Sequence, residues 1–89
     1  MNIKEFQNKV KERNMDIKKS IEGLVEDNQK IYWQLSDIYN NEGRISPQHR
    51  AILKLYIGEV MVKLAEISTE IGENFEEIAI DALLLKLMK

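Results

Sequence analysis

The sequence contains no cysteine and only one histidine, and both shortages exclude kinds of chemistry. Without cysteine the chain can form no disulfide, thiolate metal site or cysteine nucleophile, and one histidine cannot build a histidine metal cluster. The 13 basic and 15 acidic residues give a net charge of -2, which argues against the broad positive surface that contacts to a nucleic-acid backbone require. Any catalysis must therefore come from carboxylates.

Long apolar runs are also missing. The chain opens with Met1, Asn2, Ile3, Lys4 and Glu5, a charged start that predicts neither a signal peptide nor a membrane-spanning segment. We therefore expect a cytoplasmic protein that binds neither membranes nor nucleic acid. The 89 residues, of which 44% are hydrophobic, fit one domain (1–89) with a small core, and oligomerisation commonly stabilises domains of this size.

Glycine and proline are scarce, so strands are not expected and the few helix-breaking residues divide an all-α fold into four predicted helices. Two of them open with the spacing of a capping box, Asn2 with Glu5 and Asn74 with Glu77. The helices are predicted from Ile3 to about Arg13, from the N-cap Asp16 to about Tyr39, from Pro47 after the N-cap Ser46 to Gly72, and from Phe75 to about Met88.

The two long predicted helices carry apolar residues at alternating spacings of four and three, which is typical of helices that pack along one seam. A short connection around Gly43 makes them antiparallel neighbours, and pairing Leu35 with Leu53 places Asn28 opposite Val60. Asn28 is the single polar seam residue, and we interpret it as a device that fixes register or oligomeric state. The seam positions are Ile17, Ile21, Leu24, Asn28, Ile31, Leu35 and Ile38, and then Leu53, Ile57, Val60, Leu64, Ile67 and Ile71.

Four side chains flank these seams at one level of the predicted hairpin. Asp27 and Lys30 each precede a seam position on the first long helix, and Tyr56 and Glu59 do so on the second. The register places Asp27 near Glu59 and Lys30 near Tyr56, so we expect the four side chains to form one patch. Carboxylates that face each other across two helices suit Mg²⁺, which binds them together with substrate phosphates.

Residues 24–31 (LVEDNQKI) and 56–61 (YIGEVM) resemble the MazG-like family of all-α nucleoside triphosphate pyrophosphohydrolases. Residues 65–79 are similar to the family's long helix, glycine turn and last helix with paired acids, and residues 3–7 resemble its first helix. The resemblance implies a MazG-like helical bundle that assembles as a dimer or tetramer. It also implies that carboxylates hold Mg²⁺ against a nucleoside triphosphate while water releases pyrophosphate and the monophosphate.

The family signature is EExxE on one helix and ExxD on the next, and this sequence departs from it at the metal ligands. Glu26 and Asp27 match the paired acids, whereas Lys30 replaces the last acid of the first motif. In the second motif Tyr56 replaces the first acid and Glu59 stands for the final Asp. The resemblance thus implies a degenerate site, in which Asp27 and Glu59, with Glu26, are the candidate Mg²⁺ ligands. We expect the Lys30 ammonium to take the metal's place and pair with Asp27 and Glu59.

Three functions follow from this reading. The first is a MazG-like relative with an impaired Mg²⁺ site, weakly active or non-catalytic, that binds a nucleotide or a protein. The second is an active Mg²⁺-dependent pyrophosphohydrolase that works through Asp27 and Glu59, and the third is a helical adaptor that binds only another protein. No catalytic residue is assigned, and the further acids that an active enzyme could recruit are Glu26, Glu66 and Glu70.

Other residues with functional potential are interpreted as structural. His49 is expected at the surface, and Trp33, which with Tyr32 could stack a nucleotide base, is better explained by burial under another helix or at a dimer contact. The last predicted helix concentrates apolar residues near its free end, and we expect them to pack across a subunit boundary in a homo-oligomer. They are Leu83, Leu84, Leu85, Leu87 and Met88.

Overall fold

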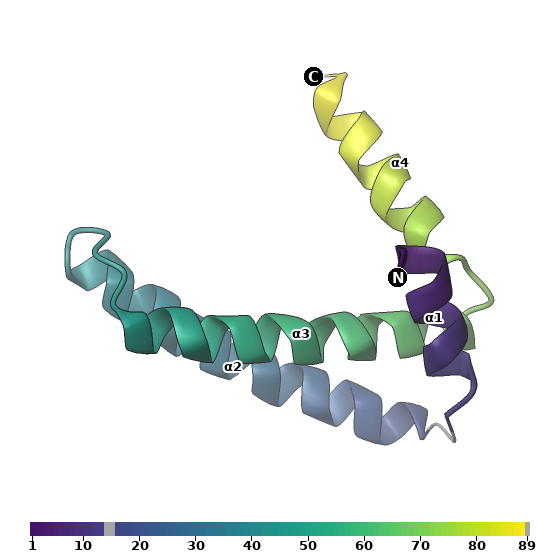
Figure 1. Ribbon diagram of the computed structural model, residues 1–89, viewed down its shortest axis with the longest axis horizontal. Coiled ribbons are helices and arrows are strands. Elements are labelled where there is room, and N and C mark those ends of the chain that lie inside the picture. Colours follow the sequence, from purple (N-terminus) through teal and green to yellow (C-terminus); the bar gives the residue numbers. More distant parts are fainter. Residues whose placement is uncertain (14–15, 89) are drawn as a thin grey trace.

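The computed structural model of the chain describes residues 1–13 and 16–88, and the predicted all-α fold is confirmed in this part of the chain. It contains the helices α1 (Ile3–Lys11), α2 (Ile17–Asn40), α3 (Pro47–Glu70) and α4 (Phe75–Leu87), each ending within two residues of the predicted position (Figure 1). None of the described helices is long and apolar enough to cross a membrane.

Each helix starts after a side chain that accepts a hydrogen bond from a backbone amide of the first turn, as predicted. The N-caps are Asn2, Asp16, Ser46 and Asn74. At α3 the capping box is reciprocal: the His49 amide donates to the Ser46 hydroxyl, and the Ser46 amide donates to His49 Nδ1, both at 3.1 Å. These contacts satisfy amides that a helix leaves without partners, and each such cap typically stabilises a helix by about 1 kcal/mol.

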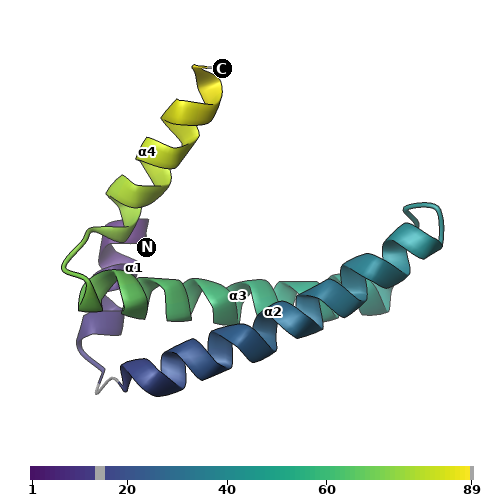
Figure 2. The same cartoon turned by 180° about the vertical axis from the view of Figure 1, so that it is seen from behind.

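The helices form a hairpin with an arm. α2 and α3 run antiparallel side by side, and α1 lies across the C-terminal end of α3 (Figures 1 and 2). Gly72, with a φ of 76°, makes the left-handed turn after α3, and α4 then rises away from the hairpin. The Cα radius of gyration is 15.1 Å, whereas a compact chain of this length has about 12 Å. The chain is therefore extended.

Four of the seven buried residues in the described part of the chain are polar. The buried apolar residues are Val10, Ile38 and Ala65, while the buried polar ones are Gln7, Ser20, Asp27 and Ser68. Every buried side-chain nitrogen or oxygen in the described part of the chain has a hydrogen-bond partner. The buried polar side chains thus have their hydrogen bonds satisfied, which avoids the cost of burying unpaired polar groups.

The predicted seam between α2 and α3 is only half correct, because both helices are rotated relative to the prediction. One set of seam positions, repeating every seven residues, is buried or half-buried between the helices, whereas the other set is exposed, including Asn28. Polar positions such as Ser20 and Asp27 turn inward instead, since they bond across to α3. The inward set is Ile17, Leu24, Ile31, Ile38, Leu53, Val60 and Ile67, and the exposed set is Ile21, Asn28, Leu35, Ile57, Leu64 and Ile71.

Candidate functional site

The four residues of the predicted patch meet at one level of the hairpin. Lys30 Nζ lies over the Tyr56 ring, 5.2 Å from its centroid, a cation–π distance. Asp27 and Glu59 converge on a single ammonium group. The predicted register, Asp27 with Glu59 and Lys30 with Tyr56, is therefore confirmed. The interaction with the Tyr56 side chain also raises the pKa of the Lys30 ammonium.

The ammonium between the two acids belongs to Lys63, so the prediction that Lys30 would pair with them is wrong. Lys63 Nζ lies 2.6 Å from Asp27 Oδ2 and 3.2 Å from Glu59 Oε2. The side chain of Lys63 reaches Asp27 by passing over Gly23, where a Cβ atom would stand 2.5 Å from Lys63 Cε. Glycine at this point of α2 leaves the path open.

This contact is largely shielded from water. The side chain of Asp27 is 9% exposed and that of Lys63 is 18% exposed, so solvent and salt screen their attraction less than they screen a surface ion pair. Burial lowers the pKa of the Lys63 ammonium, but its hydrogen bonds to Asp27 and Glu59 outweigh this effect and raise the pKa overall. Lys63 is therefore a fixed positive charge between two carboxylates.

The side chains at this level do not fit Mg²⁺. That ion requires about six oxygen ligands in octahedral geometry and an excess of negative charge. Here two carboxylates, Asp27 and Glu59, stand with two ammonium groups, Lys30 and Lys63, so the formal charge of the cluster is zero. Within residues 1–13 and 16–88, no three or more acidic or histidine side chains gather in an arrangement that could hold a metal ion.

The other candidate acids lie elsewhere. Glu66 is half-buried and accepts a hydrogen bond of 2.7 Å from the Ser20 hydroxyl. Glu26 and Glu70 are exposed side chains on α2 and α3. The structure therefore brings Asp27 and Glu59 together but adds no third carboxylate to them.

A further polar contact joins the helices near the tip of the hairpin. His49 Nε2 bonds to Asp37 Oδ2, and the His49 side chain is only 13% exposed, so the expected surface histidine is wrong. Because His49 Nδ1 accepts the Ser46 amide proton, Nε2 carries the ring proton and donates it to Asp37. Three polar ties thus join α2 to α3: Ser20 to Glu66, Asp27 to Lys63, and Asp37 to His49.

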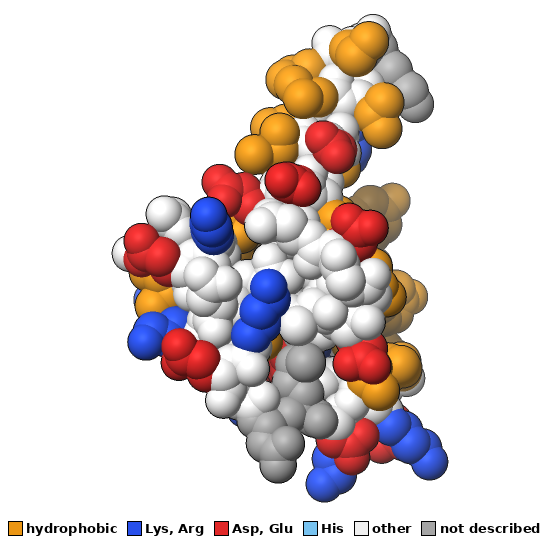
Figure 3. All heavy atoms as spheres, turned by 90° about the vertical axis from the view of Figure 1, so that its right-hand side faces the viewer, with side chains coloured by type: hydrophobic (Ala, Val, Ile, Leu, Met, Phe, Trp, Pro, Cys, Tyr) orange, Lys and Arg blue, Asp and Glu red, His pale blue; other side chains and the backbone are white. Residues whose placement is uncertain are grey.

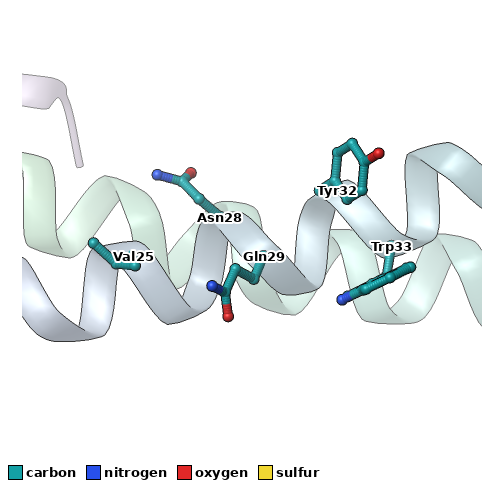
Figure 4. A pocket seen from close by; sticks show the side chains of 5 residues that line it. All are labelled: Val25, Asn28, Gln29, Tyr32 and Trp33. Atoms are coloured by element: carbon teal, nitrogen blue, oxygen red, sulfur yellow. The ribbon is translucent and has the colours of Figure 1, made fainter.

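The aromatic pair on α2 is open to solvent. Trp33 is 66% exposed, so burial under another helix of the same chain is wrong, and its ring meets Tyr32 edge to face at 5.7 Å. Both rings line a depression with Val25, Asn28 and Gln29. In Figure 4, Asn28 and Tyr32 point to one side of α2, and Gln29 and Trp33 to the other. Base stacking on Trp33 stays a prediction.

Gln7 is an important residue that the sequence analysis missed. It is 2% exposed, and its Nε2 donates to Thr69 Oγ1 and to the Glu73 carbonyl, at 3.2 and 3.0 Å. Its Oε1 accepts the Phe75 amide at 2.8 Å. One side chain of α1 thus clamps the end of α3 and the start of α4. The available signal was its place on the apolar stripe of α1, four residues after Ile3 and three before Val10.

Comparisons of this chain with protein-family models, with curated proteins and with solved structures find no match. The MazG-like resemblance therefore stays a prediction from the sequence.

Proposed function

We propose that this protein is a MazG-like helical scaffold without catalytic activity, in which the Lys63 ammonium takes the place that Mg²⁺ has in the family's enzymes. The observation that supports this proposal is the position of Lys63 Nζ, 2.6 Å from Asp27 and 3.2 Å from Glu59. A permanent cation at this point satisfies both carboxylates and repels a divalent ion.

The substitutions in the signature support the same proposal. Lys30 and Tyr56 stand where the resemblance expects acids, and the two side chains contact each other. The helices are thus joined at this level without a metal ion. We propose that the retained carboxylates, Asp27 and Glu59, serve to hold the fold together.

A scaffold of this kind acts by binding. The chain exposes many large apolar side chains along α2, α3 and α4, and such surfaces mark contacts with other proteins. We therefore propose a cytoplasmic homo-oligomer whose function depends on its assembled surface, with a nucleotide or a further protein as the molecule it binds.

Calorimetric titration of Mg²⁺, with and without a non-hydrolysable nucleoside triphosphate, tests the proposal. The wild type is expected to give no specific Mg²⁺ binding. A triple variant, Lys30→Glu, Tyr56→Glu and Lys63→Gln, adds two acids to Asp27 and Glu59 and removes the competing cation, so it is expected to gain binding. Lys54→Gln, which removes an exposed lysine of α3, is the matched control and should behave as wild type.

Two results would contradict the proposal. Specific Mg²⁺ binding by the wild type that is lost in Asp27→Ala would instead support an active pyrophosphohydrolase. A folded triple variant that gains no Mg²⁺ affinity would show that this cluster does not correspond to the family's metal position.

A further inference from the structure

One side of the hairpin carries two exposed apolar stripes, which we call together the outer face. Its α2 stripe follows the four-and-three spacing of a single helix side. Every apolar member of the face is more than a third exposed. The same spacing continues into charged residues beyond the apolar members, at Lys18 on α2 and at Arg50 and Lys54 on α3. The members are Ile21, Val25, Asn28, Tyr32, Leu35 and Tyr39 on α2, and Ile57, Met61, Leu64 and Ile71, which begin on α3 and end at its C-cap.

The two stripes adjoin each other. Ile21 and Asn28 directly follow the inward residues Ser20 and Asp27, and Leu64 directly follows the inward-reaching Lys63. In an antiparallel pair of helices, positions that follow the contact residues lie on the same side of both helices. The right-handed winding of the helices and their chain directions in Figure 2 together determine which side of the hairpin this is. It is the side toward which α4 rises. The outer face and α4 therefore meet at an angle and together form one apolar surface.

Contacts within its own chain are not enough to stabilise α4. The sequence of α4 places apolar residues on most sides of the helix, Figure 3 shows hydrophobic side chains along both edges of this arm, and α4 contains no buried residue. A helix that is apolar all round is normally buried, and an isolated helix of 13 residues is marginal in water. Leu83, Leu84 and Leu87 are 56%, 52% and 71% exposed, so most of the stabilising contacts of α4 must come from outside the chain.

The amount of exposed surface matches a dimer. The chain exposes 7106 Å², whereas a compact monomer of this size exposes about 5,400 Å². The excess, roughly 1,700 Å² per chain, is in the range that each partner buries in an obligate dimer. The nine apolar residues of the outer face alone offer on the order of 900 Å², close to the requirement of about 800 Å² per partner.

We infer that a second copy of this chain covers the outer face, hairpin against hairpin, in a two-fold dimer in which the α4 arm of each copy packs against the other copy. The listed members of the outer face carry no charge, so these residues meet the same residues of a second copy without like-charge repulsion. The inference extends the self-association included in the proposed function, and it does not depend on the role of Lys63.

The position of α4 determines the relative orientation of the two hairpins in the dimer. α4 is about 20 Å long, and a packed helix layer is about 10 Å thick, so a hairpin lying on the outer face meets the side of α4. The free tip of the hairpin exposes Tyr39 (84%) and Ile45 (57%), whereas α1 occupies the other end. An antiparallel arrangement places each apolar tip against the partner's arm, and therefore covers both surfaces at once.

Sedimentation velocity of the full chain over a dilution series tests the covered face. The wild type is expected to sediment as a dimer, and Leu35→Lys, on the outer face, to weaken the dimer by about 100-fold or more, because each dimer buries two added charges. Leu55→Lys is the matched control: Leu35 and Leu55 are 51% and 57% exposed, but Leu55 lines a depression with Trp33 on the opposite side. The control is expected to remain a dimer.

Cross-linking tests the arm, and the absence of natural cysteine makes each introduced thiol unique. Chains with Tyr39→Cys are mixed with chains carrying Leu84→Cys and treated with a short bismaleimide. The mixture is expected to yield a cross-linked dimer containing one chain of each variant, in excess over the product from either variant alone.

Three results would overturn the inference: a monomeric wild type, equal weakening by Leu35→Lys and Leu55→Lys, or a mixture of the two cysteine variants that gives no excess of mixed product. Mg²⁺ calorimetry does not report association and sedimentation does not report the metal position, so failure here is distinguishable from failure of the proposed function.

Discussion

The side of α2 that contacts α3 and the adjoining outer face differ in how far their apolar residues are buried. The contacting side buries or half-buries its apolar residues and adds the polar ties of Ser20 and Asp27, whereas the outer face exposes Val25, Tyr32 and Leu35. Polar contacts align the helices of the hairpin, while most apolar surface is directed away from it. The exposed apolar residues of the outer face are the surface that the proposed dimer would bury.

The largest expected effect is a loss of stability at the contact between α2 and α3 when Lys63 is removed. Lys63→Met leaves the carboxylate of Asp27, whose side chain is 9% exposed, without its cation. Loss of one partner of a buried ion pair is costly, and we expect the free energy of unfolding to fall by about 3 kcal/mol. Urea denaturation at fixed protein concentration measures the change, since the stability of an oligomer depends on concentration.

The double variant Asp27→Leu, Lys63→Leu is the control for this effect. It makes the inner contact apolar and removes both charges together, so it should recover most of the loss. A single variant as stable as the wild type would show that the tie contributes nothing to the fold.

Gln7→Leu should have the next largest effect. It leaves the Phe75 amide and the Glu73 carbonyl without their partner at the start of α4, and we expect a loss of about 2 kcal/mol in denaturant unfolding, because buried unpaired polar groups are costly. Gln48→Leu, at an exposed position of α3, serves as control. Equal stability of both variants would mean that α1 does not hold the arm.

The smallest expected effect is a dependence of stability on pH that comes from Lys63 at the contact between α2 and α3. The folded state raises the pKa of Lys63, so its contribution is complete below the ordinary pKa of lysine and is lost as pH rises through the raised value. Between about pH 9 and pH 12, the wild type should lose more stability than Lys63→Met. Parallel urea titrations measure this, and identical slopes for the two chains would refute it.

The fold was predictable because its signals are local. N-caps such as Asp16 and Ser46 act on amides two or three residues away, and the glycine turn at Gly72 needs only one left-handed residue. These features set where helices begin and end without reference to distant residues. The register of the hairpin followed in the same way from its short connection.

The rotation of the helices and the identity of the bridging cation were not predictable from such signals. The apolar residues of α2 cover both the inward side and the outer face, so their spacing alone does not show which side contacts α3. Lys63 could have been suspected, since it follows Glu59 by four residues, a spacing that favours a pair within one helix. Its second contact, with Asp27, depends on Gly23 and is visible only in three dimensions.

The Gln7 clamp also bears on the order in which the protein folds. Its three partners lie 62, 66 and 68 positions further along the chain, whereas the hairpin closes through a short turn. Contacts between distant segments close large loops and form late. During synthesis, α1 leaves the ribosome before α2, α3 and α4, yet its binding site does not exist until α4 has begun. Of these four helices, the one made before the others is thus the last to dock, and it completes the corner from which α4 projects.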